Sequence, residues 1–131
     1  MSESHAGGCH CGAVTFAIDG EIRNVTVCHC SICRNVHGGA AAYSQCLAGD
    51  LTVAGDVLSW YASGVGSEYG FCSACGSSLF WRRADAYVAV NAGALRGELA
   101  ITTTHHIWVE SAGSYEDLST TLPTHPRDSS S

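Results

Sequence analysis

Apolar and polar residues alternate over short stretches of this chain, and turn-forming residues separate the stretches. Alternation with a period of two is typical of β-strands that bury one face, because successive side chains point to opposite sides of a strand. Runs with a helical period are scarce, so the pattern predicts a mainly β fold. Strands are expected at residues 13–18, 25–27, 40–45, 51–53, 57–61, 78–81, 87–90 and 101–104, with another entering Cys72 and residues 106–109 extending the last.

The segments between the strands predict turns and one short helix. Gly7-Gly8 is expected to form a knuckle ahead of the first strand, and residues 34–37 to form a single helical turn before Gly38-Gly39. A chain of 131 residues suits one domain. Residues 1–122 are therefore expected to form that domain, with the polar segment 123–131 as a flexible C-terminal tail.

Composition and charge narrow the class of protein. Six Lys and Arg residues against 12 acidic ones give a formal charge of −6, without the basic stripe that nucleic-acid phosphates require. No apolar run approaches the ~20 residues that cross a bilayer, so no membrane partner is expected. The first residues lack the charged and apolar regions of a signal peptide, which favours a cytoplasmic location.

Seven of the eight cysteines fall into three short clusters. The first cluster is Cys9 and Cys11, the second is Cys28, Cys30 and Cys33, and the third is Cys72 and Cys75. In a reducing compartment such clusters are typical of metal sites, with a disulfide framework as the alternative. Structural zinc takes four ligands, whereas catalytic zinc takes three protein ligands and keeps one position open. Seven thiols therefore predict one closed and one open zinc site.

Spacing alone leaves the grouping of the clusters open. The first cluster could share a metal with the third or with the second, or all seven thiols could hold a two-metal cluster. The first arrangement is favoured because it crosslinks distant parts of a small core, where a metal stabilises the fold most. The second cluster would then hold its metal from one side, with the fourth position exposed.

The three clusters also carry a resemblance to a known family. Residues 7–12, 28–34 and 71–80 contain the motifs Gly-Gly-Cys-His-Cys-Gly, Cys-His-Cys-Ser-Ile-Cys-Arg and Phe-Cys-Ser-Ala-Cys-Gly-Ser-Ser-Leu-Phe. These motifs look like those of the glutathione-dependent formaldehyde-activating enzyme family, to which centromere protein V is related. Further matches at residues 91–95 and 106–109 extend the similarity from residue 7 to about residue 122.

The resemblance implies a β-tent fold of small antiparallel sheets stapled by zinc. It implies a structural zinc on Cys9, Cys11, Cys72 and Cys75, and an exposed second zinc on Cys28, Cys30 and Cys33. The second zinc is associated in the family with glutathione and with forming S-hydroxymethylglutathione from formaldehyde. The expected activity is that of a carbon–sulfur lyase acting on a small thiol and a small aldehyde, and a homodimer is one oligomeric state the chain allows. The alternative is a non-catalytic zinc protein that binds or carries small thiols, or whose second zinc is purely structural.

Single residues near the clusters suggest additional roles. His37 would act as an acid or base beside the second zinc, unless it is a surface histidine. Arg34 would bind a glutathione carboxylate, unless it is simply solvated. Cys46 is expected to be a small buried residue, with a fourth ligand to the second zinc as the alternative. His10 and His29 are expected to point away from the metals that their neighbouring cysteines bind.

Overall fold

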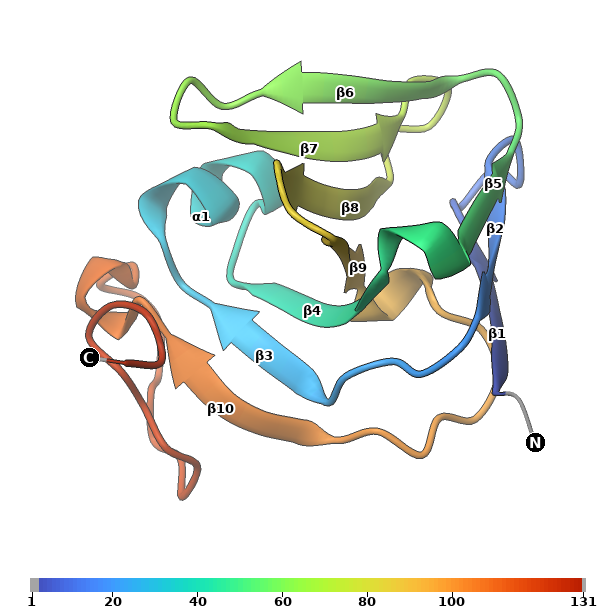
Figure 1. Ribbon diagram of the computed structural model, residues 1–131. Helices are drawn as coiled ribbons and strands as arrows, with labels where there is room; N and C mark the ends of the chain where they lie inside the picture. The colour runs from blue at the N-terminus through green and yellow to red at the C-terminus, as the bar shows by residue number, and fades with distance from the viewer. Residues whose placement is uncertain (1–2, 131) are drawn as a thin grey trace.

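The computed structural model describes residues 3–130, and its fold is mainly β, which confirms the prediction (Figure 1). A three-stranded sheet has the order β1–β2–β5, and a seven-stranded sheet has the order β10–β3–β4–β9–β8–β7–β6. The first sheet contains β1 (Ser4–Gly8), β2 (Thr15–Asp19) and β5 (Leu51–Ala54). The second contains β3 (Val25–Cys28), β4 (Ala41–Leu47), β6 (Leu58–Ala62), β7 (Ser67–Cys72), β8 (Ser78–Arg83), β9 (Tyr87–Asn91) and β10 (Thr103–Ile107).

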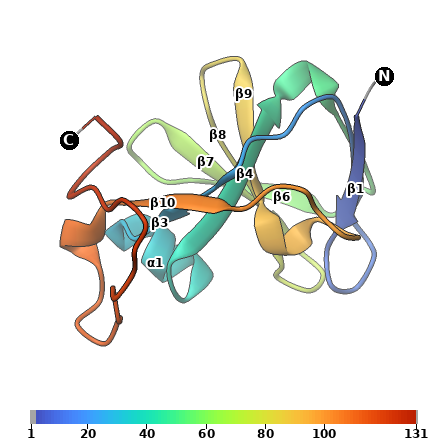
Figure 2. The same cartoon turned by 90° about the horizontal axis from the view of Figure 1, so that it is seen from below.

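The seven-stranded sheet follows an arc, and the helix α1 (Ser31–His37) lies at its open side (Figure 1). The three-stranded sheet stands at the opposite end of the molecule from α1 and the C-terminus, as both views show (Figure 2). Neighbouring strands are antiparallel except β10, which pairs in parallel with β3. Small sheets of this kind, with cysteine clusters that could hold zinc, agree with the expected β-tent fold. Within residues 3–130, no helix is long and apolar enough to span a membrane.

The Gly7-Gly8 knuckle was a wrong prediction, because both residues lie in strand β1. Gly7 pairs with Phe16 of β2. A Cβ atom on Gly7 would collide with the Phe16 ring and with the Ala94 carbonyl oxygen. Glycine at this position is therefore explained by the close approach of the neighbouring strand and loop, rather than by a turn.

The last strand is shorter than predicted, because β10 ends at Ile107. Trp108 has φ = 59°, in the left-handed region that a strand cannot use, and a 3₁₀ turn follows at Val109–Ser111. The helix is longer than predicted and begins at Ser31, because the Cys30 sulfur accepts a hydrogen bond from the Cys33 N–H and caps its first turn.

The segment predicted to be a tail returns to β10. The His106 N–H donates to the Pro123 carbonyl at 3.0 Å, and the His125 N–H donates to the His106 carbonyl at 2.9 Å. The Trp108 N–H donates to the Arg127 carbonyl at 2.7 Å. These bonds hold the start of the segment beside β10 and beside Trp108, the residue that follows β10.

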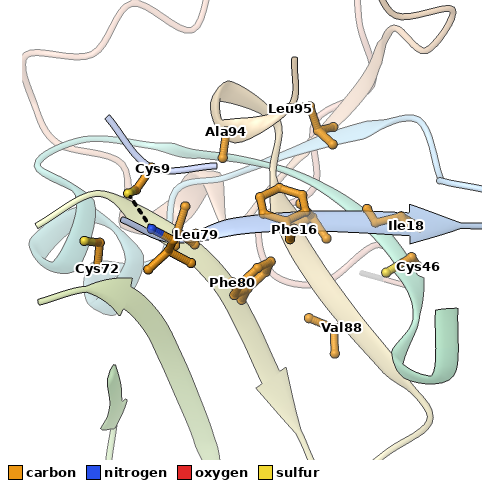
Figure 3. Packing of buried hydrophobic residues seen from close by; sticks show 12 residues of the cluster. Cys9, Phe16, Ile18, Cys46, Cys72, Leu79, Phe80, Val88, Ala94 and Leu95 are labelled. Carbon is orange, nitrogen blue, oxygen red and sulfur yellow. Dashed lines mark hydrogen bonds between the residues drawn. The ribbon is translucent and has the colours of Figure 1, made fainter. Parts of the chain in front are cut away.

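The main hydrophobic core lies between the two sheets (Figure 3). Phe16 and Ile18 of β2 face residues of β8 and β9, and the Phe16 and Phe80 rings meet edge to face with centroids 5.1 Å apart. Cys9 and Cys72 are buried members of the same cluster (Figure 3). Cys46 is also packed in this core and is 2% exposed, as predicted for a small buried residue.

Candidate metal centres and cavity

The fold brings the seven clustered cysteines together in two groups. The four-cysteine group consists of Cys9, Cys11, Cys72 and Cys75, and the three-cysteine group consists of Cys28, Cys30 and Cys33. Within each group all the Sγ atoms lie within 4.8 Å of one another. All eight cysteines are free, and the positions of the sulfur atoms agree with the first of the three groupings.

The four-cysteine group fits a tetrahedral metal ion. Zinc–sulfur bonds of about 2.3 Å in a tetrahedron place the sulfur atoms about 3.8 Å apart. The Cys9 and Cys11 sulfurs are 3.6 Å apart, and the Cys11 and Cys72 sulfurs are 3.8 Å apart. A disulfide would need about 2.05 Å. The group could therefore hold a zinc ion without rearrangement of these sulfur atoms.

Hydrogen bonds from the turns lower the pKa of two members of this group, Cys9 and Cys75. Cys9 Sγ accepts a bond of 3.2 Å from the Val14 N–H (Figure 3). The Ser77 hydroxyl lies 3.2 Å from Cys75 Sγ, and together with the backbone N–H groups of Cys11 and Ser77 it lowers the pKa of Cys75 to about 5. Gly76, at φ = 82°, closes the turn by donating its N–H to the Cys72 carbonyl at 2.7 Å.

The three-cysteine group is built where β3 passes into α1. Cys28 is the last residue of β3, Cys30 caps the helix, and Cys33 lies in its first turn. Hydrogen bonds from the Cys28 and Cys33 thiols, with the Cys33 N–H at 3.3 Å, lower the pKa of Cys30 to about 2. The bond that Cys28 donates to Cys30 raises the pKa of Cys28. The Tyr69 hydroxyl lies 3.2 Å from Cys33 Sγ.

The three cysteines open into a cavity of about 500 Å³. Its wall is largely apolar and includes Tyr43, Tyr69, Trp81, Trp108 and Ile32, with Arg83 as a cation. No fourth ligand atom from a His, Cys, Asp or Glu of residues 3–130 joins the three sulfurs within 4.8 Å. The group could therefore hold a metal ion from one side and present it to the cavity.

His37 and Arg34, the other predicted site residues, do not line this cavity. His37 contacts Tyr43, which is part of the cavity wall: the Tyr43 hydroxyl lies 2.5 Å from His37 Nε2. Burial lowers the pKa of His37. The Arg34 guanidinium lies beside Gly113, and its charge acts on the Glu116 carboxylate. The cation in the cavity wall is instead Arg83 of β8.

His29 is 4% exposed and bonds to residues outside the three-cysteine group, although it lies between two of its members. Its Nδ1 is 2.7 Å from Glu116 Oε1, and its Nε2 is 2.9 Å from His106 Nδ1. Glu116 Oε2 accepts a further bond of 2.6 Å from the Gly113 N–H. This network joins the loop that carries Cys28 and Cys30 to the segment that follows Trp108. His10, by contrast, is exposed.

Tyr43, Tyr69 and Glu116 were not predicted from the sequence as site residues. Their side chains belong to no metal-ligand pattern. Tyr43 and Tyr69 approach the cysteines from the strands β4 and β7 of the seven-stranded sheet, and Glu116 approaches His29 from a loop. The only local signal is that Tyr43, with a polar tip, occupies an inward position of the alternating pattern in β4.

Two comparisons with known proteins found similarity to this chain. The family model described as "Glutathione-dependent formaldehyde-activating enzyme" matches residues 4–111. The crystal structure of a Rhodobacter sphaeroides protein is similar to this chain, with a TM-score of 0.60 and 26% sequence identity over 76% of this chain and 99% of that one. No curated protein matches the chain.

Proposed function

The chain belongs to the glutathione-dependent formaldehyde-activating enzyme family, and we propose that it joins a small thiol to a small aldehyde at the three-cysteine group. The proposed reaction is that of an S-(hydroxymethyl)glutathione synthase, a carbon–sulfur lyase in the reverse direction, with glutathione and formaldehyde as substrates. The observation that carries the proposal is the set of three thiols at a cavity of about 500 Å³, without a fourth ligand from residues 3–130.

A zinc ion held by Cys28, Cys30 and Cys33 would offer its fourth position to the thiol sulfur and favour the thiolate form. The four-cysteine group would hold a second zinc that ties residues 9–11 to residues 72–75. Trp81, Trp108 and Ile32 would contact the carbon chain of the thiol and exclude water. Arg83 is the cavity cation that would pair with a glutathione carboxylate.

The reaction is a simple addition. The thiol releases its proton to water on binding, and the thiolate sulfur attacks the carbonyl carbon of the aldehyde. The carbon–sulfur bond forms as the π electrons move to oxygen, which takes a proton from water. The residues around the three-cysteine group orient the two partners, and orientation of this kind lowers the barrier to a bimolecular step.

The test is the exchange rate between formaldehyde, glutathione and their adduct, measured by two-dimensional exchange NMR with and without the zinc-loaded protein. We expect acceleration by the protein, and loss of that acceleration in Cys30→Ser. Cys46→Ala is the matched control, because it removes a core cysteine and keeps all seven proposed ligands. Absence of acceleration contradicts the enzyme; if calorimetry then still shows glutathione binding, the function is thiol binding without turnover.

A further inference from the structure

Tyr43 is a buried tyrosine of β4 whose side chain lines the cavity beside the three cysteines. It packs in one cluster with Cys33 and Tyr69. Its hydroxyl lies 2.5 Å from His37 Nε2, and the two rings meet edge to face. Tyr43 is therefore part of the cavity wall, and a histidine that lies outside that wall fixes the orientation of its hydroxyl.

The surroundings of His37 indicate which group donates in this hydrogen bond. His37 Nδ1 is buried and has no hydrogen-bond partner among the described residues. A buried N–H without an acceptor is rarer in proteins than an under-satisfied acceptor, so the proton is better placed on Nε2. Burial lowers the pKa of His37 and keeps the ring neutral. The Nε2–H then donates to the Tyr43 oxygen, and the proton of Tyr43 remains free for another acceptor.

Tyr69 differs from Tyr43 because its hydroxyl has a partner in the metal group. It lies 3.2 Å from Cys33 Sγ, and a thiolate at Cys33 makes the hydroxyl the donor. Of the two tyrosine hydroxyls, Tyr43 is the one whose proton is not committed to a protein atom. A tyrosine hydroxyl, with an ordinary pKa of about 10, is protonated at neutral pH and can donate.

We propose that Tyr43 donates a hydrogen bond to the oxygen of the aldehyde as the carbon–sulfur bond forms, with His37 as the residue that positions it. The inference rests on the proposed function. When the thiolate attacks the carbonyl carbon, negative charge develops on the oxygen, and a pre-oriented donor stabilises that charge more than it stabilises the neutral aldehyde. Loss of one such donor typically slows a reaction by about 10²–10³-fold.

The first test compares Tyr43→Phe with the wild type in the exchange assay. We expect a rate decrease of about 10²-fold, with zinc content and glutathione affinity unchanged. Tyr61→Phe is the matched control, because Tyr61 is 55% exposed and lies outside this cavity wall. An unchanged rate in Tyr43→Phe overturns the inference alone, whereas a wild type that does not accelerate exchange overturns the proposed function and this inference with it.

Two further measurements do not depend on turnover. Calorimetry with S-(2-hydroxyethyl)glutathione and S-ethylglutathione should show that the wild type prefers the hydroxylated ligand and that Tyr43→Phe does not; equal preferences in both proteins overturn the proposal. Nitrogen-15 NMR of the wild type should show His37 protonated on Nε2, and a proton on Nδ1 overturns the positioning role. His37→Gln, which keeps an N–H donor, should retain more activity than His37→Ala, and equal losses also contradict that role.

Discussion

Cys30 has the lowest pKa of the three-cysteine group, because two neighbouring thiols and the Cys33 N–H donate to its sulfur. Its pKa of about 2 lies far below the ordinary value of 9.0. Metal-free protein should therefore hold Cys30 as a thiolate throughout the neutral range. The thiolate is also the form that binds a metal ion, so this residue is prepared for ligation before an ion arrives.

The charge on Cys30 can be measured by alkylation of the metal-free, reduced protein with iodoacetamide. Only thiolates react, so the rate for Cys30 should stay nearly constant between about pH 5 and pH 8. An ordinary thiol loses about tenfold in rate for each pH unit below its pKa. Peptide mass spectrometry should measure the rate at Cys30 separately from the rate at Cys75, whose pKa of about 5 makes it reactive at neutral pH as well. A rate that falls tenfold per unit at Cys30 would contradict the assignment.

Substitution of Gly7 tests how closely β1 packs against its neighbours. Gly7→Ala would push a methyl group into the Phe16 ring and the Ala94 carbonyl, and it should lower the free energy of unfolding by about 1–3 kcal/mol. Gly49→Ala is the control, because no atom lies within 4 Å of its added Cβ, and it should change stability by about 0.5 kcal/mol or less. Urea unfolding monitored by tryptophan fluorescence gives both values. Equal stabilities for the two variants would show that β1 can move aside.

Among single residues, the sequence pointed to the cysteines that the fold brings together, and gave little information on the residues around them. Clustered cysteines have few roles other than metal binding and disulfide formation, so their spacing indicated candidate ligands, although it left the grouping of the clusters open. Tyr43 and Glu116 have many structural roles, and only the fold shows which cysteine or histidine each approaches. Arg34 illustrates the same limit: it adjoins Cys33 in sequence, yet its guanidinium lies beside Gly113, outside the cavity wall.

At the level of elements, the passage from β3 into α1 orients the second cluster, and β10 with its following turn closes the cavity beside it. The alternating pattern predicted most strands, because each buries one face. It missed β1, where glycines carry no such pattern. It also gave no information on the parallel pairing of β10 with β3, because pairing depends on how the whole seven-stranded sheet closes.

The pairing of residues 123–127 with β10 can be tested by amide hydrogen exchange. In the full chain, the amides of His106, Trp108 and His125 should exchange slowly, because each donates to a carbonyl across this pairing. Deletion of residues 123–131 should speed exchange at His106 and Trp108 by at least about tenfold. Amides of β9 pair within the sheet and should be unaffected. Exchange at the rate of an unstructured peptide in the full chain would instead support the flexible tail that the composition predicted.

For the molecule as a whole, the two cysteine groups differ in construction, so ions bound to them would differ in their effect on the protein. The four-cysteine group joins segments far apart in sequence and packs against the main core through Cys9 and Cys72. The three-cysteine group faces a cavity and offers only three protein ligands. Loss of an ion should therefore unfold the protein in the first case and mainly abolish thiol binding in the second.

Zinc removal tests this difference. The purified protein should contain about two zinc ions per chain, and a chromogenic chelator should remove one quickly and one slowly. Circular dichroism should change only with the slow step. Cys75→Ser should lower the melting temperature by roughly 10 °C or more, whereas Cys30→Ser should lower it by much less while removing the fast step. Release of both ions in a single step together with unfolding would contradict separate roles.

The two cysteine groups also differ in how much of the chain must be synthesised before all the thiols of each group are present. All three thiols of the cavity group lie between residues 28 and 33, whereas the four-cysteine group requires residue 75. During synthesis on the ribosome, a nascent chain emerges from its N-terminus onward, so the local group is available first. An ion can thus be captured by the three-cysteine group before Cys72 and Cys75 have emerged from the ribosome. The order of metal acquisition would follow the positions of the cysteines along the chain, whichever of the finished sites has the higher affinity.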